Sequence, residues 1–422
     1  MEINNNIANG SERKLMLFDL AIGGHHGNYI KHLIDYWCQY DSLGSLDLVV
    51  LPKFLEIHQE VVKTISIYKH PKISLITITE TEANALNSRK SGLNRLIRNF
   101  KEWDLFCHYA KLLQTTHSLI MYLDTCEIPL AAGKLSPCPF SGIYFRPTFH
   151  YSQFPGYKSS WKVKLQETRE RITLSLILQH PQLKNIFCLD PFAVKHLQHF
   201  STQTNIVYLP DPVEIDNLNS FDLASYLKKS LAIEPDRKVF LLFGALDSRK
   251  GIYQLLDAIA QLPEDLCQKL CLLLVGGTNA TERAEIKLKL EIVCKVKSIQ
   301  VIEHYEFVPA EEVSAYFQIA DVILAPYQRH VGMSGILLLA AAAGKPVLSS
   351  NYGLMGEMVR RYELGLSIDS TVSDEIVKGL TKCLKKLPQQ IGDSSKMQAF
   401  AKMNSAENYT NIIFENLKFE QM

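Results

Sequence analysis

Residues 321–350 constrain the fold of this chain more than any other stretch. An apolar run at 322–325 is stopped by a proline, and its length suits a buried parallel strand. After a loop, Ser334 precedes strong helix formers that end before Gly344, and Val347 starts a second strand. The pattern predicts one β-α-β unit with its first loop at the carboxyl end of a strand. Ligands bind at that end of open α/β sheets, although an ordinary crossover with a tight surface loop has the same pattern.

The length and composition indicate a globular protein of more than one domain. A chain of 422 residues exceeds what one hydrophobic core usually serves, so we expect two domains of roughly 200 residues each. The hydrophobic content of 47% and the charged content of 21% are typical of soluble proteins. The net charge of +1 gives no argument for nucleic acid as a partner.

The cysteines and the apolar runs indicate a cytoplasmic protein, attached to a membrane at most peripherally. The nine cysteines are scattered and form no Cys-x-x-Cys pair, which favours a reducing compartment without disulfides or a zinc site. The first ten residues are polar, and no apolar run approaches the roughly 18–20 residues that span a bilayer.

One segment of the first half is predicted to be a basic amphipathic helix, at residues 87–108. Apolar side chains recur at helical spacing from Leu93 to Trp103, and cations such as Arg95 and Arg98 lie between them. Such a helix binds the inner face of an anionic membrane, or it packs against a domain and leaves its basic face in water. Both alternatives stay open at this point.

The second half shows a loop suited to phosphate. Gly244 follows the predicted strand 238–243, and Arg249 and Lys250 come directly before a predicted helix, where phosphate is favoured. Gly276 and Gly277 follow the next strand in the same way. Glycines at such places let the backbone approach a ligand closely, and they are equally common as turn formers.

The order of these pieces resembles the second domain of retaining glycosyltransferases of family 4 (group 1), which have the GT-B fold. The shared pieces cover most of residues 238–369 and follow the family's order; they are Gly244 with Arg249-Lys250-Gly251, Val275-Gly276-Gly277, Phe307-Val308-Pro309, Ala320 to Pro326, and Ala343 to Val347. The first half resembles the acceptor domain more weakly, through the loop at Gly23-Gly24.

The resemblance implies an α/β protein with two Rossmann-like domains facing across a cleft. The N-terminal acceptor-side domain would comprise residues 1–212, and the C-terminal nucleotide-sugar domain residues 213–398. The helix within 399–422 would cross back to the first domain. A last helix is expected from about residue 394 to 419.

The resemblance also assigns donor-side residues. Lys250 matches the family lysine that contacts the diphosphate; Ala245 stands where the family has an arginine, so Arg249 is the expected second cation. The other donor-binding candidates are Gly244, Gly277, Phe307 beside the nucleobase, Ser334 and Gly335 at a helix N-terminus, and Glu357 in the next loop. The two glutamates that the family usually carries are replaced by Val331 and Leu339.

On the acceptor side, the candidates are Gly23, Gly24 and His25, with Asp124 and His150 as further catalytic candidates. A retaining transfer needs groups that orient the acceptor hydroxyl and stabilise an oxocarbenium-like transition state. Asp124 and His150 follow predicted strands, although a cap or turn residue would occupy the same positions. We expect neither a metal nor another cofactor, because the chain contains no Asp-x-Asp motif and family members usually need no metal.

The predicted activity is transfer of a hexosyl group from a nucleotide-diphosphate sugar to an acceptor hydroxyl, in polysaccharide or glycoconjugate biosynthesis. The acceptor would be a glycan, a lipid-linked sugar or a small molecule. The missing glutamates motivate a second hypothesis, a catalytically inactive donor-binding or scaffold protein. A sugar-nucleotide epimerase is a third, because that class shares the GT-B architecture.

Overall fold

The computed structural model describes residues 13–23, 26–39, 44–86, 92–154, 157, 160–200, 203–214 and 220–417. The chain divides into two compact units. The first unit comprises Met1–Phe149, Lys162–Leu209 and Tyr409–Met422, and the second comprises His150–Trp161 and Pro210–Asn408. The second unit therefore also takes in a short segment from within the first half of the chain.

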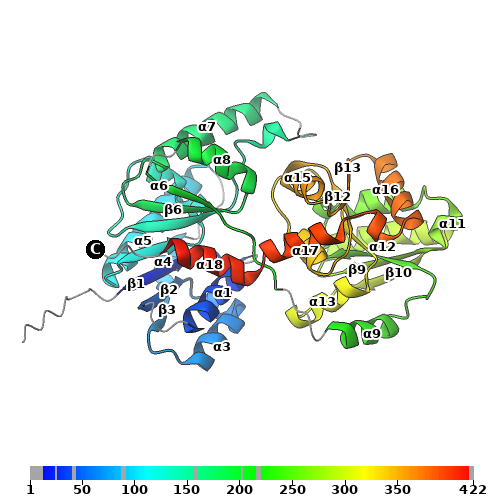
Figure 1. Ribbon diagram of the computed structural model, residues 1–422, viewed down its shortest axis with the longest axis horizontal. Coiled ribbons are helices and arrows are strands. Elements are labelled where there is room, and N and C mark those ends of the chain that lie inside the picture. The colour runs from blue at the N-terminus through cyan, green and yellow to red at the C-terminus, as the bar shows by residue number, and fades with distance from the viewer. Residues whose placement is uncertain are drawn as a thin grey trace, which may run out of the picture. The chain divides into compact units, whose positions relative to one another are not determined.

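The first unit is built on a seven-stranded sheet whose paired strands are all parallel, in the order β3-β2-β1-β4-β5-β6-β7. Figure 1 labels β1, β2, β3 and β6 of this sheet. Its strands are β1 (Lys14–Asp19), β2 (Ser45–Val50), β3 (Ile73–Thr77), β4 (His117–Ile120), β5 (Phe140–Tyr144), β6 (Leu183–Cys188) and β7 (Asn205–Tyr208). The helices are α1 (His26–Gln39), α2 (Phe54–Ile57), α3 (Gln59–Tyr68), α4 (Glu80–Leu86), α5 (Gly92–Leu112), α6 (Glu127–Ala131), α7 (Trp161–Ile177), α8 (Pro191–Phe200) and α18 (Ala406–Asn416).

This sheet is buried on both faces because its strands are apolar almost throughout. In β1, Leu15 and Leu17 join a core with α1 and α18, whereas Met16 and Phe18 join a core with α5 on the other face. The alternation follows from the two-residue repeat of a strand, and burial on both faces explains why these strands read as continuous apolar runs.

The second unit has a six-stranded sheet, again with every pair parallel, in the order β10-β9-β8-β11-β12-β13. Its strands are β8 (Lys238–Phe243), β9 (Leu270–Val275), β10 (Gln300–His304), β11 (Val322–Ala325), β12 (Val347–Ser350) and β13 (Gly365–Ile368). The helices are α9 (Ser220–Ser230), α10 (Ile252–Ile259), α11 (Glu264–Cys267), α12 (Ala280–Val296), α13 (Ala310–Ile319), α14 (Gly335–Ala342), α15 (Gly353–Arg361), α16 (Ser373–Lys385) and α17 (Ser394–Met403).

The two sheets confirm the predicted α/β fold with two Rossmann-like domains. In each, the strand order reverses beside the first strand, between β1 and β4 in one unit and between β8 and β11 in the other. Such a reversal leaves a crevice at the carboxyl ends of the two strands, which is where ligands bind in open α/β sheets. The topology therefore names one candidate place in each unit.

The predicted return of the C-terminal helix is also present, but the prediction of one last helix is wrong. The helix breaks at Ser405, which pairs with Val213 in an isolated parallel bridge, and the Val213 N–H donates to the Asn404 carbonyl at 2.8 Å. Beyond the break, Tyr409 and Phe414 of α18 pack against aromatic residues of α1 in the first unit. The break separates α17 from α18, and local helix propensity does not predict it.

Candidate functional site

The loop after β8 folds around a buried lysine. Lys250 is only 4% exposed, and its Nζ donates to the Phe243 carbonyl. Asp247 fixes the turn, because its side chain accepts the Lys250 backbone N–H at 3.2 Å. Gly244 has φ +95°, and a Cβ there would lie 2.8 Å from Lys250 Nζ. Glycine is needed here for both the backbone conformation and the approach of the ammonium.

A second glycine joins this loop to the loop after β11. Gly251 has φ +75°, and a Cβ there would lie 2.1 Å from the Pro326 carbonyl oxygen. The Gln328 N–H also donates to the Arg249 carbonyl at 2.8 Å. The two loops at the strand reversal are therefore held together through their backbones.

Tyr327, which the sequence analysis did not identify, links the cations to a helix N-terminus. Its ring centroid lies 5.1 Å from Lys250 Nζ and 5.5 Å from Arg249 Cζ, and its hydroxyl lies 3.1 Å from Ser334 Oγ. Ser334 caps α14 by accepting the Ile336 N–H at 3.4 Å. Arg249 is half exposed, with Nε 3.7 Å from Asp247 Oδ2. Both cations thus lie at the same strand reversal as the N-terminus of α14, where backbone N–H groups attract anions.

The other donor-side candidates, Gly277, Phe307 and Glu357, have three different surroundings. The Gly277 carbonyl accepts the Leu246 N–H at 2.9 Å, so the end of β9 borders the Lys250 loop. Phe307 is 87% exposed after β10. Glu357 instead pairs with Arg360 on its own helix at 2.8 Å.

Val331 and Leu339 stand at the two positions where the family usually has glutamates. Val331 precedes the cap of α14, and its carbonyl accepts the Leu354 N–H at 3.0 Å. Leu339 lies inside α14 and is half buried. Neither side chain supplies a hydrogen-bond acceptor.

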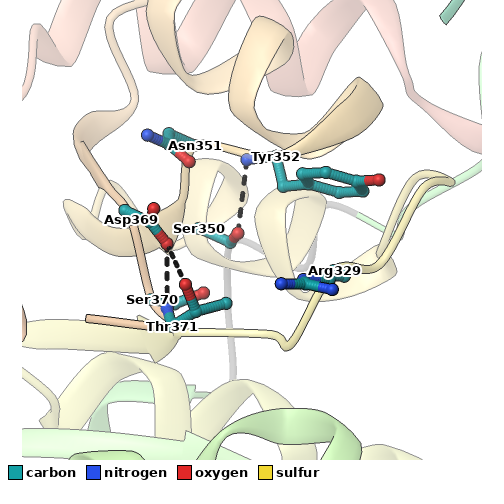
Figure 2. Close-up of a pocket in the computed structure, with 7 residues that line it drawn as sticks. All are labelled: Arg329, Ser350, Asn351, Tyr352, Asp369, Ser370 and Thr371. Atoms are coloured by element: carbon teal, nitrogen blue, oxygen red, sulfur yellow. Dashed lines mark hydrogen bonds between the residues drawn. The ribbon is translucent and has the colours of Figure 1, made fainter. Parts of the chain in front are cut away.

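A polar pocket that the sequence analysis missed lies at the carboxyl ends of β12 and β13 (Figure 2). Arg329 lines it with a left-handed φ of 48°, an uncommon conformation for a residue with a side chain. Asp369 accepts from the N–H and the hydroxyl of Thr371 at 3.0 and 2.6 Å. Tyr352 completes one side, stacked against Tyr157 with ring centroids 5.1 Å apart.

The first unit has its own pocket, of about 90 Å³, at the carboxyl ends of β1 and β4. Asp19 lines it and accepts from the Ala21 N–H at 2.8 Å, with its other oxygen 2.7 Å from His26 Nδ1. Burial alone would lower the pKa of His26, but the hydrogen bond and the charge of Asp19 outweigh burial and raise it. Asp19 was not predicted as a site residue, because an aspartate at the end of a strand does not by itself indicate which residue it contacts.

Asp124 lies in the same unit, and its oxygens are already engaged. They accept the N–H groups of Phe145 and Arg146, each at 3.0 Å, so the carboxylate ties the end of β5 to the loop after β4. Burial raises the pKa of Asp124 to about 6. Burial, together with the charges of Asp124 and Glu170, raises the pKa of Glu127 to about 8.

His150 and Asp124 fall in different units of the chain. His150 belongs to the second unit, is 1% exposed, and packs edge-on against Tyr151 and Phe154. Gly23 has open space around its Cα, whereas Gly24 and His25 lie outside the described residues. The catalytic roles of Asp124 and His150 stay predictions.

The described residues include neither a cluster of metal ligands nor a helix that could span a membrane. Over residues 13–417 with their gaps, no group of three His, Cys, Asp or Glu side chains is placed to hold a metal ion. Within the same part of the chain, each helix is too short or too polar to cross a bilayer.

Comparison with known proteins gives a family match in the second unit. Residues 226–398 match the family model for glycosyl transferases group 1. A lipopolysaccharide 1,2-N-acetylglucosaminetransferase of Salmonella typhimurium is 30% identical over 197 residues, which are 46% of this chain and 51% of that protein. The chain spans about half the length of the first curated relatives it matches.

Solved structures extend the likeness to nearly the whole chain. Sucrose-phosphate synthase from Thermosynechococcus elongatus aligns with a TM-score of 0.67 and 16% identity, covering 96% of this chain and 99% of that one. Anabaena HepE, solved in complex with UDP and glucose, aligns with a TM-score of 0.62, 16% identity and the same coverage. These likenesses show the GT-B fold, and with the family match they support the group 1 GT-B superfamily.

Proposed function

We propose that this protein is a glycosyltransferase that moves a hexosyl group from a nucleotide-diphosphate sugar to an acceptor hydroxyl with retention of anomeric configuration. The observation that carries the proposal is the Lys250 loop. Two cations and the capped N-terminus of α14 lie at one strand reversal, inside the region that matches glycosyl transferases group 1. That combination suits a diphosphate leaving group.

In the proposed reaction, negative charge grows on the diphosphate as the bond to the sugar breaks. The Lys250 ammonium has three N–H donors, of which the Phe243 carbonyl takes one, so donors are left for a phosphate oxygen. Arg249 and the N-terminus of α14, which begins at Gly335 after its cap Ser334, supply further positive potential. Groups that are held in place before charge develops stabilise a transition state at little reorganisation cost.

Residues of the second unit that follow β8, β9 and β10 are proposed to contact the base and the phosphates of the donor. Exposed Phe307 offers a ring face to a nucleobase, Gly244 lets the Lys250 ammonium come close to the backbone, and Gly277 leaves open space after β9. No metal or other cofactor enters the proposed reaction. The complex of HepE with UDP supports a uridine-diphosphate sugar as the first donor to try.

On the acceptor side, the proposal uses the pocket of the first unit. Asp19 and Tyr122 line this pocket, and His26 contacts Asp19 at the carboxyl end of β1. A hydroxyl bound there would meet hydrogen-bonding groups that are already oriented. We therefore assign acceptor orientation to Asp19, held by its contact with His26, ahead of His150, which packs edge-on against two aromatic rings.

The testing experiment is a panel of UDP-, GDP- and ADP-sugars with the purified full chain. We expect a thermal shift with one donor and slow release of its nucleotide diphosphate, accelerated by the right acceptor. Failure of every nucleotide sugar to bind would refute the proposal.

Val331 and Leu339, which stand in place of the family's glutamates, motivate one alternative: a protein that binds the donor without catalysis. In the same panel that protein would show binding and no release across all acceptors. Appearance of an epimerised donor, followed by NMR, would instead indicate a sugar-nucleotide epimerase.

A further inference from the structure

Helix α7 has the reverse of the usual amphipathic arrangement: its acidic side chains face inward. Glu167 is 8% exposed. Glu170 accepts from the Tyr144 hydroxyl at 3.0 Å and from the Thr148 N–H at 2.8 Å. Both acidic residues of the helix are therefore withdrawn from its outer surface.

The outer side of α7 is apolar. Trp161, Leu165, Ile172 and Leu176 are 70, 63, 58 and 47% exposed. They are four, seven and four residues apart, which places them on one face of a single continuous helix. A contiguous apolar face on a protein surface marks an interaction site, because leaving it in water costs roughly 25 cal/mol per Å².

The charges that border this face are positive. Lys162, Lys164 and Arg169 are exposed on α7. Arg171 is not part of this set, because it is only partly exposed; its guanidinium donates to the Phe149 carbonyl at 3.0 Å. The exposed part of α7 thus combines an apolar stripe with cations and presents neither of its acids.

We propose that the α7 face, defined as Trp161, Leu165, Ile172 and Leu176 with the flanking Lys162, Lys164 and Arg169, lies in the interface of an anionic lipid bilayer. Charge complementarity selects this occupant, since a helix with an apolar face, flanking cations and a tryptophan binds in the plane of such a surface. The proposal does not depend on the proposed enzymatic activity.

Two other helices show why α7 is the better candidate. Helix α12 also exposes apolar residues, Leu288 and Ile292, but exposed Glu285 and Glu291 lie among them and would be repelled by anionic lipid. In α5, for which membrane binding and domain packing were both open alternatives, Trp103 is buried in the core and Arg98 Nε pairs with Glu102 at 2.6 Å. The C-terminal part of the predicted stripe on α5 is thus used for packing.

The test uses tryptophan fluorescence of the full chain with vesicles of phosphatidylcholine alone or mixed with phosphatidylglycerol. Of the three tryptophans, Trp37 and Trp103 are at most 2% exposed, so a change in environment reports on Trp161. We expect a blue shift and co-sedimentation with the anionic vesicles only, both weakened by salt. Trp161→Phe should abolish the blue shift and keep most of the sedimentation.

Matched variants separate the two contributions. Leu165→Gln with Ile172→Gln should lower partitioning about tenfold or more, since two apolar side chains leave the interface. Neutralising Lys162, Lys164 and Arg169 to Gln should lower it about a hundredfold. The control, Leu288→Gln with Ile292→Gln on α12, removes equally exposed apolar groups and should leave partitioning unchanged.

Three outcomes would overturn the proposal. The first is wild-type protein that stays in the supernatant with anionic vesicles at low salt. The second is an equal loss of binding in the α7 and α12 variants. The third is a dimer, seen by light scattering, that the α7 variant dissociates while vesicle binding is absent, which would assign the face to a second copy of the chain.

Discussion

The two units present the same topological opening and line it with different chemistry. In the second unit, the reversal between β8 and β11 is built from backbone, with positive φ at Gly244 and Gly251, and from the cations Arg249 and Lys250. In the first unit, the pocket beside β1 and β4 is lined by titratable groups such as Asp19, Glu102 and Tyr122. One side is suited to holding a fixed negative charge, and the other to handling protons and hydroxyls.

The largest effect is expected when the buried cation of the second unit, Lys250, is removed. Lys250→Ala should lower the rate of transfer and of donor hydrolysis about 100- to 1000-fold, because a preorganised positive group no longer meets the leaving diphosphate. Steady-state kinetics with the donor identified in the panel measures this. Asp19→Asn serves as the contrast; it should reduce transfer and leave donor hydrolysis nearly intact. Unchanged turnover in Lys250→Ala would remove the role assigned to that residue.

The backbone part of the comparison can be sharpened with two glycines. Gly251→Ala should reduce the free energy of unfolding by about 2–3 kcal/mol, since the new Cβ meets the Pro326 carbonyl and the φ is left-handed. Gly277→Ala is the matched control: its Cβ has open space and no left-handed φ, so little change is expected. Urea denaturation of both variants measures the difference. Equal midpoints would show that the join between the two loops does not need glycine.

A pH series tests the titratable character of the first unit. The folded pKa of Glu127 is raised to about 8 from its ordinary value of 4.5, so between those values the folded chain binds more protons than the unfolded chain. Stability should therefore fall as pH rises through that window. Glu127→Gln should flatten the dependence and be more stable than wild type by about 1–2 kcal/mol at the upper end. Parallel curves for the two proteins would contradict the shift.

The smallest expected effect concerns the cap of α14. Ser334→Ala should cost about 1 kcal/mol of stability and weaken donor binding a few-fold, because the cap and the contact with Tyr327 are both lost. Asp393→Ala removes the cap of α17, where Asp393 accepts the Lys396 N–H at 2.9 Å, and should cost the same stability with donor affinity unchanged. Calorimetry gives both quantities. A loss of affinity in both variants would mean that the cap acts only through global stability.

The second unit was the more predictable from sequence, for a local reason. Ser334 before a run of helix formers and Gly344 after it are signals carried by neighbouring residues, and the structure has α14 with Ser334 as its cap. Lys250 likewise lies next to the glycines that shape its loop. Tyr327 escaped notice because a tyrosine after a strand has no distinctive pattern, and only the fold brings it beside residues of two other segments.

The first unit was less predictable because its contacts are long in sequence. Asp124 acts on the N–H groups of Phe145 and Arg146, about twenty residues later, and Glu127 is perturbed by Glu170 from α7. Helix α7 reads as simply charged, and nothing local tells that Glu167 points inward and Leu165 outward. Which face of a helix is covered depends on the elements that pack beside it.

The sequence by itself determined the two α/β units, their apolar parallel strands and the capped helix in residues 321–350, because these depend on periodicity, caps and glycines within short windows. The tertiary structure decided which strand ends became neighbours, and so brought Lys250 beside Tyr327, and Asp124 to the N–H groups of Phe145 and Arg146. It also decided that the outer face of α7 is apolar and basic. Burial, pKa and exposure are properties of packed surroundings, and those surroundings come from segments far apart along the chain.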